Sequence, residues 1–175
     1  MNASSDHALA LYLAVEHFIV TRFMRGGVNP FFRVLFKLPI LMYRLGLGRL
    51  IGKRIVLLTT IGRKTGKPRV TALGFGYDAP NDTYYVMAGW GGKSDWLRNA
   101  SANPRVCARV GARQFDGIAT RVPEAQAVAL MCEYARINPR VSQMWSRLGD
   151  VPFDDSEEAW RKLARYFPSL SLCPR

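Results

Sequence analysis

Apolar and polar residues alternate in several short stretches of the chain, which is the pattern of half-buried β-strands. These stretches are rich in β-branched and aromatic residues, and glycine, proline, asparagine or aspartate stands between most of them, as in strands joined by turns. We expect six strands, at residues 54–61, 70–77, 83–88, 105–110, 114–121 and 170–173. Because most of them follow one another as hairpins, the predicted sheet is antiparallel.

Other stretches have the spacing of three to four residues between apolar positions that predicts amphipathic helices. A helix is expected to begin after a cap at Ser4 or Ser5 and to end at Gly26, and Ser94 is expected to cap a later one. The later helices are predicted at residues 95–100, 124–136, 140–148 and 156–165.

Hairpin strands with helices inserted late in the chain indicate an α+β protein built on an antiparallel barrel. The 175 residues suit one globular domain overall, which is the usual size of a single core. We divide the chain into a basic, helical N-terminal extension at residues 1–52 and a barrel domain at residues 53–175.

Residues 28–51 mix apolar clusters with single cations, which is the composition of an amphipathic segment at a membrane interface. We expect Pro39 and Gly46 or Gly48 to divide the segment into short helices. The same apolar residues could instead dock on the barrel or on a second subunit, so contact with an anionic membrane and a homodimer both stay open. No apolar run reaches the ~20 residues that cross a bilayer. We expect a cytoplasmic protein, with peripheral contact at the inner face of the cell membrane left open.

The positive charge of the chain is concentrated in one region. The net charge is +12, and residues 17–77 hold twelve of the 25 cations and none of the 13 acidic residues. Such a local field attracts phosphates, carboxylates and anionic lipid headgroups. Nucleic acid is disfavoured, because the aromatic residues of this region lie among aliphatic ones, as on a buried face, and not on an open stacking surface.

The residues that usually carry catalysis are scarce. His7 and His17 are the only histidines, and Cys107, Cys132 and Cys173 are widely spaced. No cluster has the spacing of metal ligands, and no barrel histidine is present to activate a serine or cysteine. We therefore predict no metal, assign no catalytic side chain, and expect an anionic cofactor to carry the reaction.

Two segments have the composition of an anion-binding site. Residues 62–69, Gly-Arg-Lys-Thr-Gly-Lys-Pro-Arg, form a cationic turn that matches neither the P-loop nor the dinucleotide pattern. Residues 89–99 join a glycine loop to the start of a helix, where free backbone N–H groups favour an anion. Trp90 or Trp96 could stack on a flat ring, although tryptophans more often anchor a core or an interface.

These two segments together resemble the deazaflavin-dependent nitroreductase family. The resemblance rests on Leu-Leu-Thr-Thr-Ile-Gly-Arg-Lys-Thr-Gly-Lys-Pro-Arg at 57–69, the glycine pair at 91–92, Asp-Trp-Leu-Arg-Asn at 95–99 and Ala-Asn-Pro at 102–104. It covers roughly residues 53–121 and the closing strand. It implies a split β-barrel of the flavin-reductase-like group, in which reduced coenzyme F420 gives a hydride to a quinone, a nitroaromatic or another apolar acceptor.

The resemblance also implies the residues of the cofactor site. Lys64 and Arg69 would hold the phosphate and the oligoglutamate tail, while Thr71 and Ala72 would lie beside the deazaflavin ring. The whole predicted set is Arg63, Lys64, Arg69, Thr71, Ala72, Ala88, Gly89, Trp90, Gly91, Gly92, Lys93, Trp96 and Asn99.

The chain departs from the family pattern in two places. Many members have Ser-Lys-Gly-Gly where residues 89–92 read Gly-Trp-Gly-Gly, which indicates a rearranged tail site. The tyrosines of nitroimidazole-reducing members correspond to Gly74, Asn138, Val141 and Met144, which disfavours nitroimidazole as the acceptor. Two alternatives remain: FMN in the same groove, and a non-catalytic protein that binds lipid or a cofactor at the membrane surface.

Overall fold

The computed structural model describes residues 37–51 and 54–175. The helix expected to end at Gly26 and the other predictions for residues 1–36, 52 and 53 lie outside the described residues. The described chain forms two compact units. Residues 37–51, 54–123 and 166–175 form a barrel unit, and Glu124–Arg165 form a helical unit. The predicted boundary between residues 52 and 53 stays a prediction.

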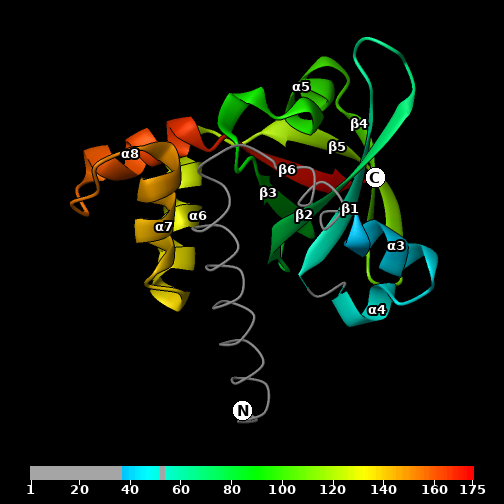
Figure 1. The fold of residues 1–175 in the computed structure, drawn as a ribbon, viewed down its shortest axis with the longest axis horizontal. Helices are drawn as coiled ribbons and strands as arrows, with labels where there is room; N and C mark the ends of the chain where they lie inside the picture. The colour runs from blue at the N-terminus through cyan, green and yellow to red at the C-terminus, as the bar shows by residue number, and fades with distance from the viewer. Residues whose placement is uncertain (1–36, 52–53) are drawn as a thin grey trace. The chain divides into compact units, whose positions relative to one another are not determined.

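Six antiparallel strands close the barrel in the order β1-β2-β3-β6-β5-β4 (Figure 1). They are β1 (Ile55–Ile61), β2 (Pro68–Asp78), β3 (Thr83–Met87), β4 (Arg105–Val110), β5 (Arg113–Arg121) and β6 (Ser169–Pro174). The predicted α+β class and six-stranded antiparallel barrel are therefore confirmed. Each predicted strand agrees with an observed one to within about two residues at either end, the usual uncertainty of such boundaries.

Alternate residues of each strand fill the barrel. Val56 and Leu58 of β1, Val86 of β3 and Leu172 of β6 are almost fully buried in one cluster, as the two-residue period of a strand requires. Their neighbours along each strand form the outer face. Burying side chains of this size stabilises the fold by roughly 1.5–3 kcal/mol each.

Two short helices precede the barrel strands in the sequence: α3 (Leu38–Arg44) and α4 (Gly48–Ile51). Pro39 lies in the first turn of α3, where its missing N–H has no partner to lose. The expectation that it divides the segment stays a prediction, because the residues before Lys37 lie outside the described ones. Gly46, with φ of 78°, follows the end of α3. Buried Tyr43 fixes α3 to the barrel, because its hydroxyl donates to Ile55 O at 2.7 Å and accepts from Gly111 N at 2.9 Å.

The helix α5 (Asp95–Ala102) follows a short 3₁₀ turn, η2 (Gly91–Lys93). Its apolar face, with Trp96, Leu97 and Ala100, belongs to the barrel core. Ser94 occupies the predicted cap position, but its side chain makes no capping hydrogen bond. The prediction that Ser94 caps this helix is therefore right in position and wrong in its chemistry.

The helical unit contains α6 (Glu124–Ile137), α7 (Val141–Gly149) and most of α8 (Glu157–Tyr166). Within it, Arg165 Nε lies 2.8 Å from Glu124 Oε2, and the rings of Phe153 and Trp160 meet edge to face at 4.8 Å. No helix in the described residues has the length and apolar character needed to cross a membrane.

Candidate functional site

The tip of the β1–β2 hairpin is a tight loop with two required glycines. Gly62 N donates to Lys67 O at 2.9 Å, and Gly66 N donates back to Gly62 O at 2.8 Å. Gly66 has φ of 65°, a left-handed conformation that glycine adopts without steric cost. Lys64 is therefore presented at an exposed tip, which projects from one end of the barrel (Figure 1).

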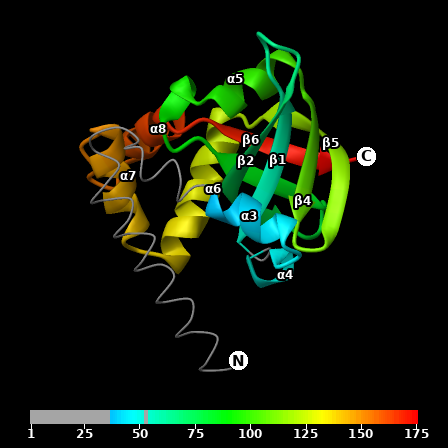
Figure 2. The ribbon, with the colours of Figure 1, turned by 45° about the vertical axis from the view of Figure 1, so that its right-hand side comes forward.

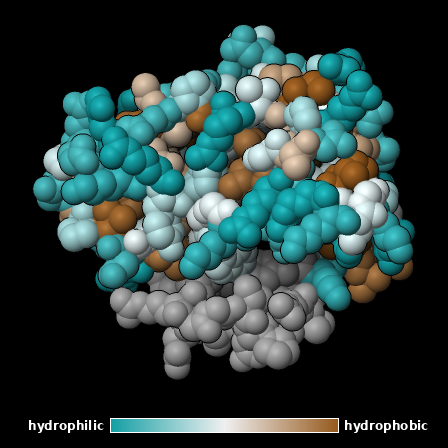
Figure 3. Space-filling view, turned by 90° about the horizontal axis from the view of Figure 1, so that it is seen from above, coloured by the Kyte–Doolittle hydropathy of each residue, from teal (hydrophilic) through white to brown (hydrophobic). Residues whose placement is uncertain are grey.

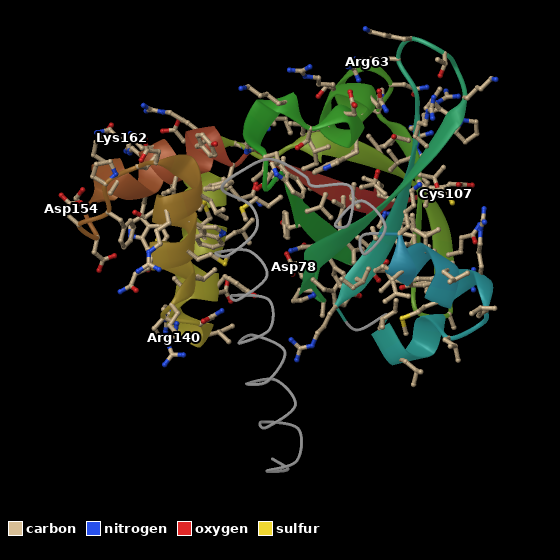
Figure 4. The ribbon with its side chains drawn as sticks, in the orientation of Figure 1. Arg63, Asp78, Cys107, Arg140, Asp154 and Lys162 are labelled. Carbon is tan, nitrogen blue, oxygen red and sulfur yellow. The ribbon has the colours of Figure 1, made fainter. Side chains whose placement is uncertain are left out.

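The hairpin tip is bound to α5 through one arginine. The backbone N–H and the guanidinium of Arg63 both donate to Asn99 Oδ1, at 3.2 and 2.9 Å. Arg63, labelled in Figure 4 beside α5, also has its guanidinium 2.9 Å from Asp95 Oδ1, and Asn99 Nδ2 donates to Thr60 Oγ1 at 3.4 Å. The two segments singled out in the sequence thus meet, and Arg63 and Asn99, both predicted to bind the cofactor, bind each other.

Replacing Asn99 with alanine is expected to lower the free energy of unfolding by about 1–3 kcal/mol, because the Arg63 N–H and the Thr60 hydroxyl lose their partner. Asn99 is only 5% exposed, so water cannot replace the lost amide easily. Thermal unfolding measures the change. Ser101→Ala is the control, since it removes the side-chain hydrogen bond of an exposed residue from the same helix. Equal melting temperatures for the two variants would contradict a structural role for Asn99.

The other cations of the two segments are not neutralised in this way. Within the described part of the chain, no carboxylate pairs with Lys64, Lys67, Arg69 or Lys93. The stem of Arg69 lies against the hairpin, because its Cγ is 3.6 Å from where a Cβ on Gly62 would be. Seen from this end, the surface is mostly hydrophilic, with separate apolar patches (Figure 3). The site therefore carries a net positive charge.

The glycine loop before α5 is held by backbone bonds. Ala88 N donates to Pro168 O and Gly91 N donates to Ala88 O, each at 2.9 Å. Gly91 has φ of 59°, and a Cβ there would lie 2.9 Å from Tyr166 O, so another residue would strain the loop. A Cβ on Gly92 would meet nothing within 4 Å. Gly91 thus serves the turn, whereas Gly92 leaves open space beside Lys93.

The start of α5 contains an unpartnered polar group. Among residues 37–51 and 54–175, Ser94 Oγ is the buried side-chain oxygen without a hydrogen-bond partner, although Ser94 is only 8% exposed. The first N–H groups of α5 also have no side-chain cap. Free N–H groups, a free hydroxyl and unpaired cations are the donors that an anionic group needs. Asp95 is the acidic group nearby, and Arg63 already pairs with it.

The remaining predicted residues lie in three environments. Thr71 and Ala72 follow Arg69 along β2 and pair with Leu58 and Leu57 of β1. Trp90 is 38% exposed in the loop, beside half-buried Gly89. Trp96 is 7% exposed and belongs to the barrel core. It therefore agrees with the alternative given for the tryptophans, that they anchor the core.

Sequence reasoning did not assign three residues of this site. Lys67 stands in the quoted turn and was recognisable by its charge alone. The free hydroxyl of Ser94 and the pairing of Asp95 with Arg63 depend on contacts between distant segments. No local pattern signals such contacts.

Comparison with known proteins identifies the family of the chain. Residues 42–164 match the F420H(2)-dependent quinone reductase family. The chain belongs to this family. The sequence resembles deazaflavin-dependent nitroreductases, whereas the matching family is that of the quinone reductases. The name of this family includes coenzyme F420, the cofactor that the sequence predicts.

The similarity of this chain to individual proteins is lower or covers less of the chain. An F420H(2)-dependent quinone reductase of Mycobacterium tuberculosis is 40% identical over 83 residues, which are 42% of this chain and 54% of that protein. The chain thus spans about half the length of the curated relatives it matches. An F420-H2 dependent reductase of known structure is 22% identical, with a TM-score of 0.49, over 69% of this chain and 94% of that one. A heme storage protein of Vibrio cholerae is 17% identical, with a TM-score of 0.46, over 76% and 89%.

Proposed function

We propose that this chain is a reductase that binds reduced coenzyme F420 at the end of the barrel where the hairpin tip meets α5, and that its acceptor is a quinone. The observation that carries the proposal is the group of unpaired cations, Lys64, Lys67, Arg69 and Lys93, beside the uncapped start of α5. Membership of the F420H(2)-dependent quinone reductase family supports the choice of cofactor and acceptor. The division into an extension at residues 1–52 and a barrel domain at residues 53–175 is part of the same proposal.

The described residues fit an anionic cofactor of this kind. Lys64 and Arg69 would hold the phosphate and the acidic tail, since lysine acts as a point charge and arginine as a bidentate fork. Ser94 Oγ and the first N–H groups of α5 add neutral donors. Thr71 and Ala72 would border the ring.

When bound, the reduced deazaflavin supplies the hydride, and the protein acts by orientation and electrostatics. We assign no side chain as the proton donor, and water would give the proton to the acceptor. The rigid parts of the site are the Arg63–Asn99 contact and the glycine loop bonded to Pro168. They would fix the distance between the anion-binding end and the ring.

A fluorescence titration of the purified protein with coenzyme F420, and separately with FMN, tests the proposal. We expect micromolar binding of F420 that weakens as the salt concentration rises, because screened cations lose attraction for an acidic tail. FMN is expected to bind much more weakly. Tight FMN binding would favour the alternative of a flavin enzyme, and binding of neither would favour a non-catalytic protein. Oxidation of bound F420H2 by a quinone, faster than by a nitroaromatic, tests the acceptor.

We also propose peripheral contact with an anionic membrane through α3, α4 and the turn between them. Five leucines of this segment are between 44% and 73% exposed, Leu38, Leu41, Leu45, Leu47 and Leu50. Lys37 and Arg44 lie among them, and apolar side chains beside cations are typical of an interfacial segment.

Replacing both Leu45 and Leu50 with serine is expected to reduce binding to anionic vesicles by about a hundredfold or more, because each buried leucine contributes roughly 1.5–3 kcal/mol and about 1.4 kcal/mol corresponds to a tenfold change in affinity. Cosedimentation with phosphatidylglycerol vesicles measures the loss. Ile137→Ser is the control, since this residue is 65% exposed on the helical unit. If the wild type, the double leucine variant and Ile137→Ser bind the vesicles equally, or if the wild type does not bind them, the membrane contact is ruled out.

A further inference from the structure

A pocket of about 190 Å³ lies between α3 and the outer face of the barrel. Figure 2 shows α3 in front of the barrel strands. The strand pairing builds it from two adjacent rows of outward-facing residues. Arg109 pairs with Leu57 on one side and with Gln114 on the other, and Thr59 pairs with Val70 and Cys107. These six residues line the pocket, and α3 completes it.

Two charged groups line this pocket: Arg44 of α3, which is exposed, and Arg109 of β4. Arg109 is half-buried, and its guanidinium lies 5.3 Å from the centre of the Tyr43 ring. No carboxylate of the described residues pairs with it. Asp116, the acidic residue nearest in the strand pairing, lies opposite Cys107, and after burial its carboxylate is the next cause that raises the pKa of that thiol. A partly desolvated cation without an anion is unfavourable, so a bound anion would stabilise it.

The remaining walls of the pocket determine the rest of the ligand. Leu57 and Val70 from the barrel and Ile40 from α3 are apolar, whereas Thr59 and Gln114 can hydrogen-bond to an oxygen beside Arg109. The Tyr43 hydroxyl is already bonded to Ile55 and Gly111. A volume of about 190 Å³ is below that of pockets for drug-sized ligands, which measure roughly 300–1,000 Å³. One ring or a short chain therefore suits it.

We propose that this pocket binds a small carboxylate with an apolar body, whose carboxylate pairs with Arg109 while its body lies against Leu57, Val70 and Ile40. The proposal does not depend on the proposed reductase activity. It concerns the outer face of β1, β2, β4 and β5 beneath α3, and not the hairpin cations.

Benzoate and benzamide, which have the same size but differ in charge, test the proposal on the wild-type protein. Calorimetric titration should show one benzoate site, weakened by salt, with benzamide bound at least about tenfold more weakly, as expected for loss of a charge-assisted bond. Cys107 provides a local reporter, because it lines the pocket and Cys173 is exposed. Benzoate should slow alkylation of Cys107 by iodoacetamide and leave Cys173 unchanged. Burial raises the pKa of the Cys107 thiol, so the labelling is done at about pH 8.5, near the pKa of a free thiol.

Two variants identify the guanidinium as the binding group. Arg109→Gln should weaken benzoate roughly tenfold to a hundredfold, while Arg105→Gln, on the same strand and outside the pocket, should bind as the wild type does. Arg69→Gln should also bind benzoate normally, which separates this pocket from the hairpin cations. Equal affinity for benzoate and benzamide, no protection of Cys107, or normal binding by a folded Arg109→Gln variant would overturn the proposal. If that variant does not fold, the wild-type comparison decides.

Discussion

Replacing Arg69 with alanine is expected to raise the dissociation constant for coenzyme F420 roughly tenfold to a hundredfold. The expected loss is about 1.5–3 kcal/mol, the contribution of a hydrogen bond to a charged group. No carboxylate of the described chain competes for Arg69, and its stem rests against Gly62, so its guanidinium is partly positioned before the cofactor binds. Fluorescence titration at low and high salt measures the change, and the variant should also depend less on salt.

The control for this prediction is Lys162→Ala, which removes one positive charge from α8 in the helical unit. It separates a local contact from the general attraction of a basic protein for an anion. Lys64→Ala should behave like Arg69→Ala, since both belong to the hairpin. Normal F420 binding by both hairpin variants would show that the tail lies elsewhere, even if the protein is an F420 reductase.

Local patterns in the sequence were sufficient to predict the barrel. The bounds of β4, Arg105–Val110, agree with the predicted strand at both ends, because Pro104 and the Gly111-Ala112 turn delimit an alternating stretch. The loop at residues 62–67 likewise depends on its own glycines. Turn chemistry and side-chain periodicity act over a few residues, so they are readable without a structure.

Features that depend on contacts between distant segments could not be predicted. Arg63 has the charge of a phosphate ligand, yet Asn99 and Asp95 occupy its guanidinium. Ser94 has the residue type of a helix cap, yet its hydroxyl has no partner. The pocket at Arg109 exists because strand register aligns β1, β4 and β5 and α3 packs over them. Register over such separations is not encoded in any single motif.

Replacing Gly117 with alanine is expected to destabilise the protein by about 3 kcal/mol or more, which in a chain of this size lowers the melting temperature by roughly 6–12 °C. Gly117 lies in β5, and a Cβ there would be 2.5 Å from Cys173 O in β6. The obstacle is backbone, which cannot rotate away as a side chain can. The two strands would have to separate, and β6 is the strand that joins β5 to β3 in the closed barrel.

Gly76→Ala is the matched control, because Gly76 lies in β2 and a Cβ there meets nothing within 4 Å. This variant should be unchanged or more stable by up to about 1 kcal/mol, since alanine restricts the unfolded chain. Scanning calorimetry compares the two variants, and equal melting temperatures would show that β5 and β6 are not so closely paired.

The change at Gly117 should also affect the cofactor site, because Ala88 is bonded to Pro168 immediately before β6. A displaced β6 would move the glycine loop, so Gly117→Ala should also weaken F420 binding, whereas Gly76→Ala should not.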